Sequence, residues 1–359
     1  MRREKNQYIF ASEVGRKQRG HRIRNAVLLI IPLIIVSILV ANFMVSRQVK
    51  VEEIRLTILN LPADLEGFTI LHLSDLHGAR YGEEQKAIQS ALQNIRYSCV
   101  VMTGDMLGEN GDTKPLLELN AVLKSDVPKY LIPGDTEEAP VDSQAHSSLS
   151  VYAEWAEEIQ AAGITLLEEP ALITREKGRI WFVPEELYAL DTDRMLGVYG
   201  RQLKELQERA TSLSADDAAK IRALEHEIAL LERLQETRKT FLATDIQVAL
   251  THTPLTEEYV RDLVSWSGKE DFFSLRYTGL ILAGHNNGGQ WRIPFVGAIY
   301  VPELGWFPPD ELVQGLSYPE GIPQHISPGL GSDPRYQYQP GRLFNPPMIT
   351  RIVLTSKAN

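Results

Sequence analysis

Apolar and polar residues come in blocks along the chain, and the apolar blocks predict short buried strands that each end in a polar loop. Four runs of apolar, largely β-branched residues have this form, at residues 68–73, 99–102, 246–250 and 279–282. The segments at their ends read LSDLHG, TGD, THTP and AGHNNGGQWRIP, and each carries a carboxylate, an imidazole or both. Loops that follow buried strands in this way assemble metal sites. The pattern therefore predicts four loops that converge at one sheet edge.

The apolar run at residues 26–45 is almost uninterrupted, and roughly 20 such residues are needed to cross a bilayer. The segment before it is rich in Lys and Arg, and its only acids are Glu4 and Glu13. The positive-inside rule predicts a basic cytoplasmic tail over residues 1–25, a single-pass cell-membrane anchor over residues 26–45 and a main domain outside the cytoplasm. A cleaved signal peptide is the competing interpretation, but the run exceeds the usual h-region of about 7–15 residues and no A-x-A site follows it.

The pattern changes between residues 190 and 243, where the chain is charged, Leu-rich and poor in Gly. Apolar residues recur there at helical spacing, and Ser214 to Asp217 has the S-x-x-D form of a capping box. We predict a helical hairpin inserted into a main domain of residues 51–359. Two roles stay open for it: a decoration that covers a sheet edge, or a lid or arm that binds a protein partner.

Charge divides sharply along the chain. Residues 1–50 carry ten basic and two acidic residues, which leaves 27 basic and 45 acidic residues beyond Lys50, a net charge of −18. Such a domain repels nucleic acid, so we expect no nucleic-acid partner. The only cysteine, Cys99, lies in an apolar run and is predicted to pack as a small hydrophobic residue.

The ordered motifs resemble those of the calcineurin-like metallophosphoesterases, and within them the membrane-anchored bacterial branch, whose last motif continues as GGQ-x-R-x-P. The resemblance covers most of the chain from about residue 51 to residue 354. It implies an α/β fold: a two-sheet metallophosphoesterase sandwich flanked by helices, here with an inserted helical hairpin and an N-terminal transmembrane helix. The matching residues, in the order of the D-x-H, G-D, lone-His and G-H-x-H motifs, are Asp75, His77, Asp105, His252 and His285.

Two motifs depart from the family pattern. Where the family has G-N-H-[ED], residues 134–137 read GDTE, so Asp135 replaces the metal-binding Asn and Thr136 replaces the catalytic His. Where the family has G-H-T-H, residues 284–287 read GHNN, so Asn287 replaces the second His. A threonine hydroxyl cannot act as an acid near neutral pH, and we expect impaired catalysis at this position.

The family's ligand roles, carried over residue by residue, imply two metal positions that share one carboxylate. One would be held by Asp75, His77, Asp105 and Asn287. The other would be held by Asp105, Asp135, His252 and His285. The amide of Asn287 is a weak ligand, so we expect unequal occupancy by one or two divalent ions. Carboxylates suit Mn and Mg, while the imidazoles accept Mn, Fe or Zn.

Single residues of this set have plainer interpretations. A lone His after a strand is more often structural than a ligand, and Asp105 after a glycine is by itself a turn residue. Their occurrence in order, at strand ends, outweighs those interpretations. His72 lies inside a predicted strand and is interpreted as structural, and no role is assigned to His325. The tail at residues 321–354 resembles the family's closing segment, and we expect it to have a structural role near the site mouth.

The resemblance implies an enzyme that uses metal to hydrolyse a phosphoester or pyrophosphate bond, on a phosphorylated small substrate near the membrane. By similarity to this branch, a lipid-linked substrate is one option. The lost imidazoles keep a second hypothesis open, a catalytically impaired relative that acts as a metal-binding scaffold or binding module. A third hypothesis is a purely structural envelope protein without metal, which predicts that the candidate ligands are scattered.

Overall fold

The computed structural model describes residues 7–142, 150–209, 214–266, 272–336, 338–339 and 341–357. The chain divides into two compact units, Met1–Arg47 and Gln48–Asn359. The four predicted strands all lie in the second unit.

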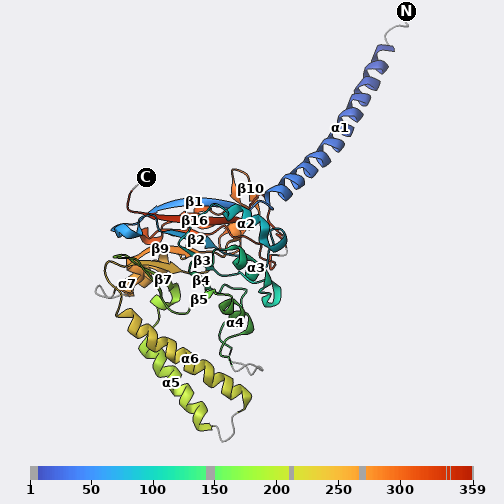
Figure 1. Cartoon of the computed structure of the whole chain (residues 1–359). Helices are drawn as coiled ribbons and strands as arrows, with labels where there is room; N and C mark the ends of the chain where they lie inside the picture. The colour runs from blue at the N-terminus through green and yellow to red at the C-terminus, as the bar shows by residue number, and fades with distance from the viewer. Residues whose placement is uncertain are drawn as a thin grey trace, which may run out of the picture. The chain divides into compact units, whose positions relative to one another are not determined.

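The first unit is a single helix, α1 (Gln7–Val45), seen at the N-terminal end of the chain in Figure 1. Its segment Arg24–Val45 is long and apolar enough to cross a membrane, and none of its most apolar stretch is buried. A helical stretch that is apolar on every face is typical of a membrane span. The helix begins well before the predicted anchor and so runs through much of the predicted basic tail, whose side chains up to residue 23 lie outside the described part of the chain.

The second unit contains two six-stranded sheets (Figure 1). The first has the strand order β1 (Lys50–Thr57), β16 (Met348–Thr355), β2 (Thr69–Leu73), β3 (Cys99–Thr103), β4 (Lys129–Ile132) and β5 (Thr165–Leu166). The second has the order β14 (Gly315–Ser317), β15 (Gln324–Ile326), β9 (Thr278–Ala283), β8 (Ile246–Leu250), β7 (Arg179–Pro184) and β6 (Ala171–Thr174). The predicted two-sheet α/β sandwich is therefore confirmed.

One core cluster fills the space between the sheets. It joins Ile70 and Val101 of the first sheet to Val248 and Leu280 of the second, all fully buried. Because successive residues of a strand point to opposite faces, the intervening residues pack outward against helices. Burial on both faces explains why these strands are continuously apolar. The covering helices are α2 (Lys86–Leu92), α3 (Lys114–Val122) and α4 (Glu154–Ala161) on the first sheet and α7 (Glu257–Trp266) on the second.

Strand direction determines which loops can meet. In the first sheet β2, β3 and β4 are parallel, and in the second β7, β8 and β9 are parallel, so the carboxyl ends within each set share an edge. Strand β16 runs antiparallel to β2, with Thr350 opposite His72, and β1 runs parallel to β16, with Lys50 opposite Met348. Strand β1 therefore begins at the edge where β2 and β3 end.

The region predicted as a helical insertion consists mainly of two helices, α5 (Thr192–Arg209) and α6 (Ala215–Arg238), which project together from the sheets (Figure 1). Ser214 caps α6, because its Oγ accepts a hydrogen bond of 3.1 Å from the backbone N–H of Asp217, as the S-x-x-D pattern predicts. The base of the hairpin is anchored by Leu234, which is buried in a cluster with Trp181.

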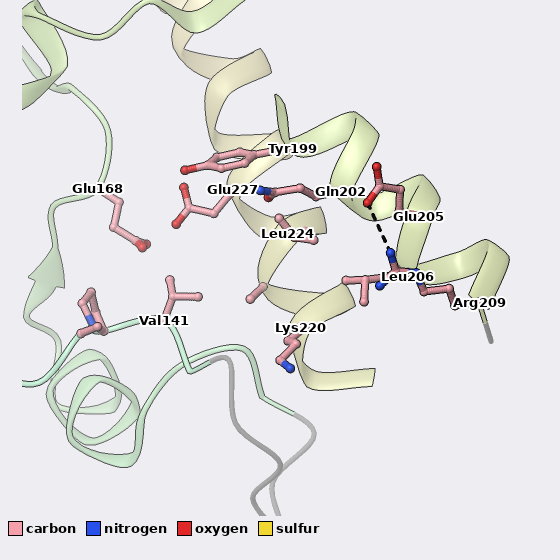
Figure 2. Close-up of a pocket in the computed structure, with 13 residues that line it drawn as sticks. Val141, Glu168, Tyr199, Gln202, Glu205, Leu206, Arg209, Lys220, Leu224 and Glu227 are labelled. Carbon is pink, nitrogen blue, oxygen red and sulfur yellow. Dashed lines mark ion pairs between the residues drawn. The ribbon is translucent and has the colours of Figure 1, made fainter. Parts of the chain in front are cut away.

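A cavity of about 620 Å³ lies between this hairpin and the segment at residues 139–141 (Figure 2). Its apolar lining includes Leu206 and Leu224, while Tyr199 and Glu227 line it on the polar side. Burial raises the pKa of Glu227. The hairpin thus packs on the domain at its base and through the middle of α6, where His226 Nε2 lies 3.3 Å from Glu168 Oε1, and it leaves a hollow beside its outer part.

Candidate metal centre

The loops behind β2, β3, β8 and β9 meet at one edge of the sandwich. Backbone hydrogen bonds join them directly: Asp75 N donates to Gly104 O at 3.0 Å, His77 N to Asp105 O at 2.9 Å and Gly284 N to His252 O at 2.8 Å. The last of these bonds lies within the second sheet's loops, and Asp75 Oδ1 links the two sheets by accepting from His285 N at 2.9 Å. The predicted convergence is therefore a consequence of strand register and backbone pairing.

Three overlapping groups of side chains bring potential ligand atoms within 4.8 Å of one another. They are Asp135 with His252 and His285, Asp75 with Asp105 and His252, and His77 with Asp105 and Asp333. Six of the seven predicted metal ligands thus lie in one connected cluster. This convergence contradicts the scattered arrangement expected of a purely structural protein.

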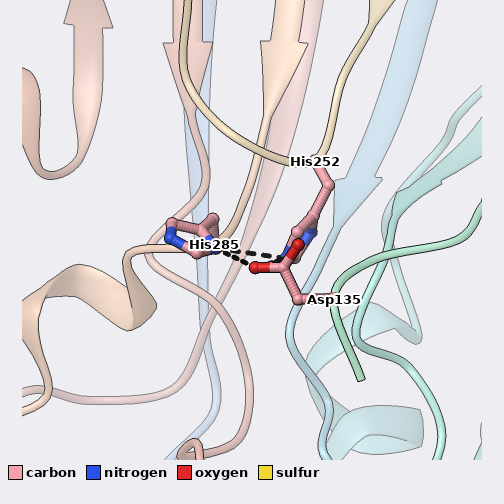
Figure 3. Close-up of side chains that lie close together, drawn as sticks. All are labelled: Asp135, His252 and His285. Carbon is pink, nitrogen blue, oxygen red and sulfur yellow. Dashed lines mark hydrogen bonds and ion pairs between the residues drawn. The ribbon is translucent and has the colours of Figure 1, made fainter. Parts of the chain in front are cut away.

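The first group, here called the histidine-pair half, consists of Asp135, His252 and His285 (Figure 3). Asp135 Oδ2 lies 3.0 Å from His285 Nδ1 and 3.9 Å from His252 Nε2. On its other side, His252 Nδ1 is 2.7 Å from the carbonyl oxygen of Thr103, and this contact orients the ring. Each side chain of this half therefore has a partner within the protein.

The group of His77, Asp105 and Asp333, here called the His77 half, has unsatisfied atoms. His77 Nε2 and Asp105 Oδ2 are buried and have no hydrogen-bond partner among the described residues, and the same is true of Oδ1 of the neighbouring predicted ligand Asn287. His77 Nε2 lies 3.6 Å from Asp105 Oδ2, too far for a hydrogen bond. Buried polar atoms without partners are costly, and these are oxygen and nitrogen donors of the kind that bind divalent cations. The residues therefore fit a metal ion.

The electrostatics of the cluster also favour cations. Burial raises the pKa of Asp75. Burial acts in the same direction on Asp105, but the neighbouring imidazoles of His252 and His77 outweigh it and hold the pKa of that carboxyl well below its usual range. Burial opposes the charged form of His252, yet Asp105 and Asp75 raise its pKa to about 10. Carboxylates thus dominate the local field, which stabilises positive charge.

Glu137 organises the loops that carry the shared carboxylate. Its side chain accepts backbone hydrogen bonds from Asp105 at 2.8 Å, Met106 at 2.6 Å, Leu107 at 3.0 Å and Gly134 at 2.7 Å. One carboxylate therefore ties the loop behind β3 to the loop behind β4. In the sequence, Glu137 is the last residue of the GDTE segment, and the motif alone does not indicate this role.

Thr136, which stands where the family pattern has an acid, contacts the shared carboxylate directly. Its backbone N–H and its hydroxyl both donate to Asp105 Oδ1, each at 2.8 Å. This double contact leaves Oδ2 of the same carboxylate directed to His77 and His252, at 3.6 and 3.4 Å. Thr136 is therefore a positioning residue for Asp105.

The loops are held in sparsely populated backbone conformations. Asp75, His77, Asp105, His285 and Asn287 all have positive φ, between 45° and 74°. Such residues cost free energy and cluster at functional sites. Close packing adds a further constraint, because a Cβ on Gly104 would lie 2.6 Å from Gly134 Cα and 2.7 Å from His252 Nδ1.

An arginine that sequence reasoning missed stands beside the His77 half. The guanidinium of Arg335 makes a two-nitrogen contact with the Asp333 carboxylate, at 2.6 and 2.9 Å, and lies 3.9 Å from Asp105 Oδ2. Its side chain is about half exposed. Asp333 and Arg335 belong to a Gly- and Pro-rich segment, where no periodicity marks a functional residue.

The closing segment of the chain packs against the metal-site loops through backbone hydrogen bonds. Arg342 is buried and donates to the backbone carbonyls of Asn345 at 2.9 Å, Gly331 at 2.5 Å and Pro328 at 2.7 Å. Asn345 Nδ2 in turn donates to Asn287 O at 2.8 Å. These contacts agree with the structural role predicted for this tail. His72 is likewise structural, since it is buried against His325 and the Thr103 hydroxyl.

Comparison with known proteins gives the family. Among solved structures the chain is similar to phosphopantetheinyl hydrolase from Mycobacterium tuberculosis, with 13% identity and a TM-score of 0.35, covering 80% of this chain and 96% of that one. It is also similar to a protein from Staphylococcus aureus assigned as a 5′-nucleotidase and solved with alpha-ketoglutarate, with 8% identity and a TM-score of 0.33, covering 82% of this chain and 55% of that one. A search of curated proteins returns no match. The model of the calcineurin-like phosphoesterase family matches residues 68–287, a range that covers more than half of the chain and every loop of the cluster except the one that carries Asp333, and the chain belongs to that family.

Proposed function

We propose that this protein uses one or two divalent ions to hydrolyse a phosphoester or pyrophosphate bond of a small phosphorylated substrate at the outer face of the membrane, with a lipid-linked substrate as one option. Family membership supports metal-dependent phosphoester hydrolysis in general. The observation that carries the proposal for this chain is the convergence of its carboxylates and imidazoles around three buried ligand atoms without partners.

In this proposal the histidine-pair half and Asp105 hold one ion, and Asp75, His77, Asp105 and Asn287 hold the other. Divalent ions in such a centre activate water and neutralise charge on a phosphoryl group. The mixed set of carboxylate, imidazole and amide donors suits Mn, Fe, Zn or Mg.

The residues of the protein supply positioning and charge. Arg335, fixed by Asp333, presents a half-exposed guanidinium beside Asp105 and suits a non-bridging phosphate oxygen, because a guanidinium pairs with oxyanions in two-pronged geometry. Thr136 holds Asp105 through its hydroxyl and so cannot protonate a leaving group. Substrates with good leaving groups should therefore be cleaved much faster than those with poor ones.

A second candidate function is a catalytically impaired scaffold that binds metal without turnover. The specific observation in its favour is the same contact of Thr136, which leaves that position without a side-chain acid. General acid catalysis contributes roughly 10²–10⁴-fold, so its loss can reduce turnover to background levels.

Restoring the lost imidazoles distinguishes the two functions. Thr136→His and Asn287→His, alone and together with Asp135→Asn, should raise hydrolysis of an aryl phosphodiester in Mn²⁺, and a poor leaving group should gain more than an activated one. The matched control is Thr57→His with Asn60→His, which introduces the same side chain at exposed positions remote from the loops. If the wild type and the restored variants all bind metal but remain silent on every phosphoester, the hydrolase proposal is wrong and the scaffold takes its place.

The location is tested separately. The basic flank and the apolar span of α1 support an uncleaved anchor with the main domain outside the cytoplasm. Protease added to intact protoplasts should digest the main domain, and N-terminal sequencing of the membrane fraction should find residues 1–45 still attached. Full protection of the domain would contradict this orientation.

A further inference from the structure

Two short hairpins directly after the last metal-site loop carry exposed apolar side chains. The first is β10 (Arg292–Ile293) with β11 (Gly297–Ala298), and the second is β12 (Tyr300–Val301) with β13 (Gly305–Trp306). The side chains in question, here called the hairpin patch, are fully or substantially exposed. They are Ile293 (41% exposed), Phe295 (109%), Val296 (62%), Trp306 (71%) and Phe307 (57%). Exposed apolar side chains concentrated on two neighbouring hairpins make a candidate interaction surface.

The two hairpins form one structure next to the metal centre. Ile299 N donates to Trp291 O and Phe307 N to Ile299 O, each at 2.9 Å, so their bases lie side by side. In the turn of the second hairpin, Glu303 Oε1 lies 3.4 Å from His285 Nε2. The second hairpin, which carries part of the hairpin patch, therefore adjoins the metal centre.

The chain enters the main domain at the same sheet edge. Lys50 starts β1 opposite Met348; Met348 N donates to Gly329 O at 3.2 Å, and the next residue, Leu330, donates through its N–H at 3.1 Å to the carbonyl of Ser74, the residue before the ligand Asp75. Only residues 46–49 separate the end of α1 from β1. At about 3.3–3.6 Å per residue, that connection can extend over no more than about 17 Å.

We propose that the hairpin patch contacts the lipid bilayer in which α1 is anchored, with Phe295 and Val296 among the upper acyl chains and Trp306 at headgroup level. This inference rests on the membrane anchor of the proposed function and is independent of hydrolysis. The composition suits a lipid surface, because Trp and Tyr favour the membrane interface while Phe and Val favour the apolar side of it. Tyr300, whose ring is 5.0 Å from that of Trp306, and Tyr338 extend the aromatic group beside the patch.

The negative charge of the main domain indicates that its contact with lipid is made by apolar residues alone. The chain beyond Lys50 carries a net charge of −18, so anionic headgroups repel this domain. The contact should therefore form on a neutral phosphatidylcholine bilayer and gain nothing from anionic lipid. If the patch contacts the bilayer, the metal centre opens at the height of the lipid headgroups. The phosphates accessible there are those of lipid-linked molecules.

The test uses the full chain in phosphatidylcholine nanodiscs with bromine- or spin-labelled acyl chains. The only native cysteine, Cys99, is fully buried, so an introduced cysteine can be labelled selectively with an environment-sensitive fluorophore. Val296→Cys probes the patch. Leu59→Cys is the matched control, because Leu59 is 86% exposed just beyond the opposite end of β1, about 25–30 Å from Lys50.

The label at position 296 should be quenched several-fold more by the lipid-borne quencher than the label at position 59, and should be less accessible to iodide in solution. Equal quenching at the two positions would overturn the proposal. Protection from iodide that appears in lipid-free detergent and rises with protein concentration would also overturn it, because it would assign the patch to a second copy of the chain.

A second pair of variants distinguishes failure of the membrane-contact proposal from failure of the proposed hydrolase function. Phe295→Ser with Trp306→Ser should leave metal content and any hydrolysis of a water-soluble aryl phosphodiester unchanged, and should abolish the lipid quenching of a label at position 296. Leu59→Ser with Leu172→Ser removes two exposed apolar residues elsewhere and should leave the quenching intact. If the protein proves inactive on every phosphoester, the quenching result still decides the membrane contact.

Discussion

The two halves of the metal centre differ in how their ligand atoms are satisfied. In the histidine-pair half, His285 pairs with Asp135 at 3.0 Å and His252 is oriented by a backbone carbonyl at 2.7 Å. In the His77 half, His77 Nε2, Asp105 Oδ2 and the neighbouring Asn287 Oδ1 are buried without hydrogen-bond partners among the described residues, and the guanidinium of Arg335 lies 3.9 Å from Asp105 Oδ2. The protein thus places a fixed positive charge beside the half that adjoins the weak amide ligand Asn287. Both features predict one tight and one weak ion.

Asp105→Asn should have the largest effect, because this carboxylate is shared by both halves and lies at the centre of the cluster. We expect the loss of both ions, since an amide cannot replace a bridging carboxylate. Elemental analysis of the purified protein after dialysis measures this directly. Asp126→Asn, at an exposed position, is the control and should retain wild-type metal. Retention of one tight ion by Asp105→Asn would show that the two halves do not depend on a common ligand.

Glu137→Gln should weaken both halves together, because Glu137 binds four backbone N–H groups of the two loops that meet at Asp105. Hydrogen bonds to a charged group are worth roughly 1.5–3 kcal/mol each, and an amide retains only part of them, so we expect a loss of about 1–3 kcal/mol in unfolding free energy. Thermal unfolding in EDTA measures the stability, and titration with Mn²⁺ measures both affinities. A change in the affinity for only one of the two ions would contradict this role of Glu137. Glu138→Gln, at the exposed neighbouring position, is the control.

Arg335→Ala should act on the two halves unequally. Removing a positive charge 3.9 Å from Asp105 Oδ2 should tighten the weak ion by about tenfold and leave the tight ion nearly unchanged. The same change should raise KM for a phosphoester, because the guanidinium no longer holds the phosphate. Calorimetric titration with Mn²⁺ reports the first effect and steady-state kinetics the second. Arg80→Ala, which breaks an exposed ion pair with Glu118, is the control and should change neither.

Asp135→Asn should have the smallest effect, and only on the histidine-pair half. The Asp135 side chain is 43% exposed, so solvent screens its charge and its replacement by the family's amide should loosen the tight ion only a few-fold. Competition with a fluorescent chelator resolves a change of this size. A loss as large as that of Asp105→Asn would mean that Asp135, rather than the shared carboxylate, dominates the centre.

Much of the architecture could be predicted from the sequence because its signals are local. The apolar runs correspond to β2, β3, β8 and β9, and the cap at Ser214 marks the start of α6. Asp333, Arg335 and Glu303 could not be predicted, because they lie in irregular segments where no period or motif marks them. The sequence shows that Thr136 replaces the family's histidine. Its hydrogen bonds to Asp105, in contrast, depend on how two loops pack.

The sequence by itself determined the apolar anchor segment, the buried strands and the residue types at their ends, because burial and backbone periodicity are properties of short stretches of chain. The tertiary structure decided which of those residues share a site, which ligand atoms remain without partners and which cation stands beside them. These features depend on strand register, on loop conformations with positive φ and on hydrogen bonds between residues far apart in the sequence, such as that from His285 N to Asp75, which are 210 positions apart. Such contacts form only when the two sheets are packed together, so no local pattern encodes them.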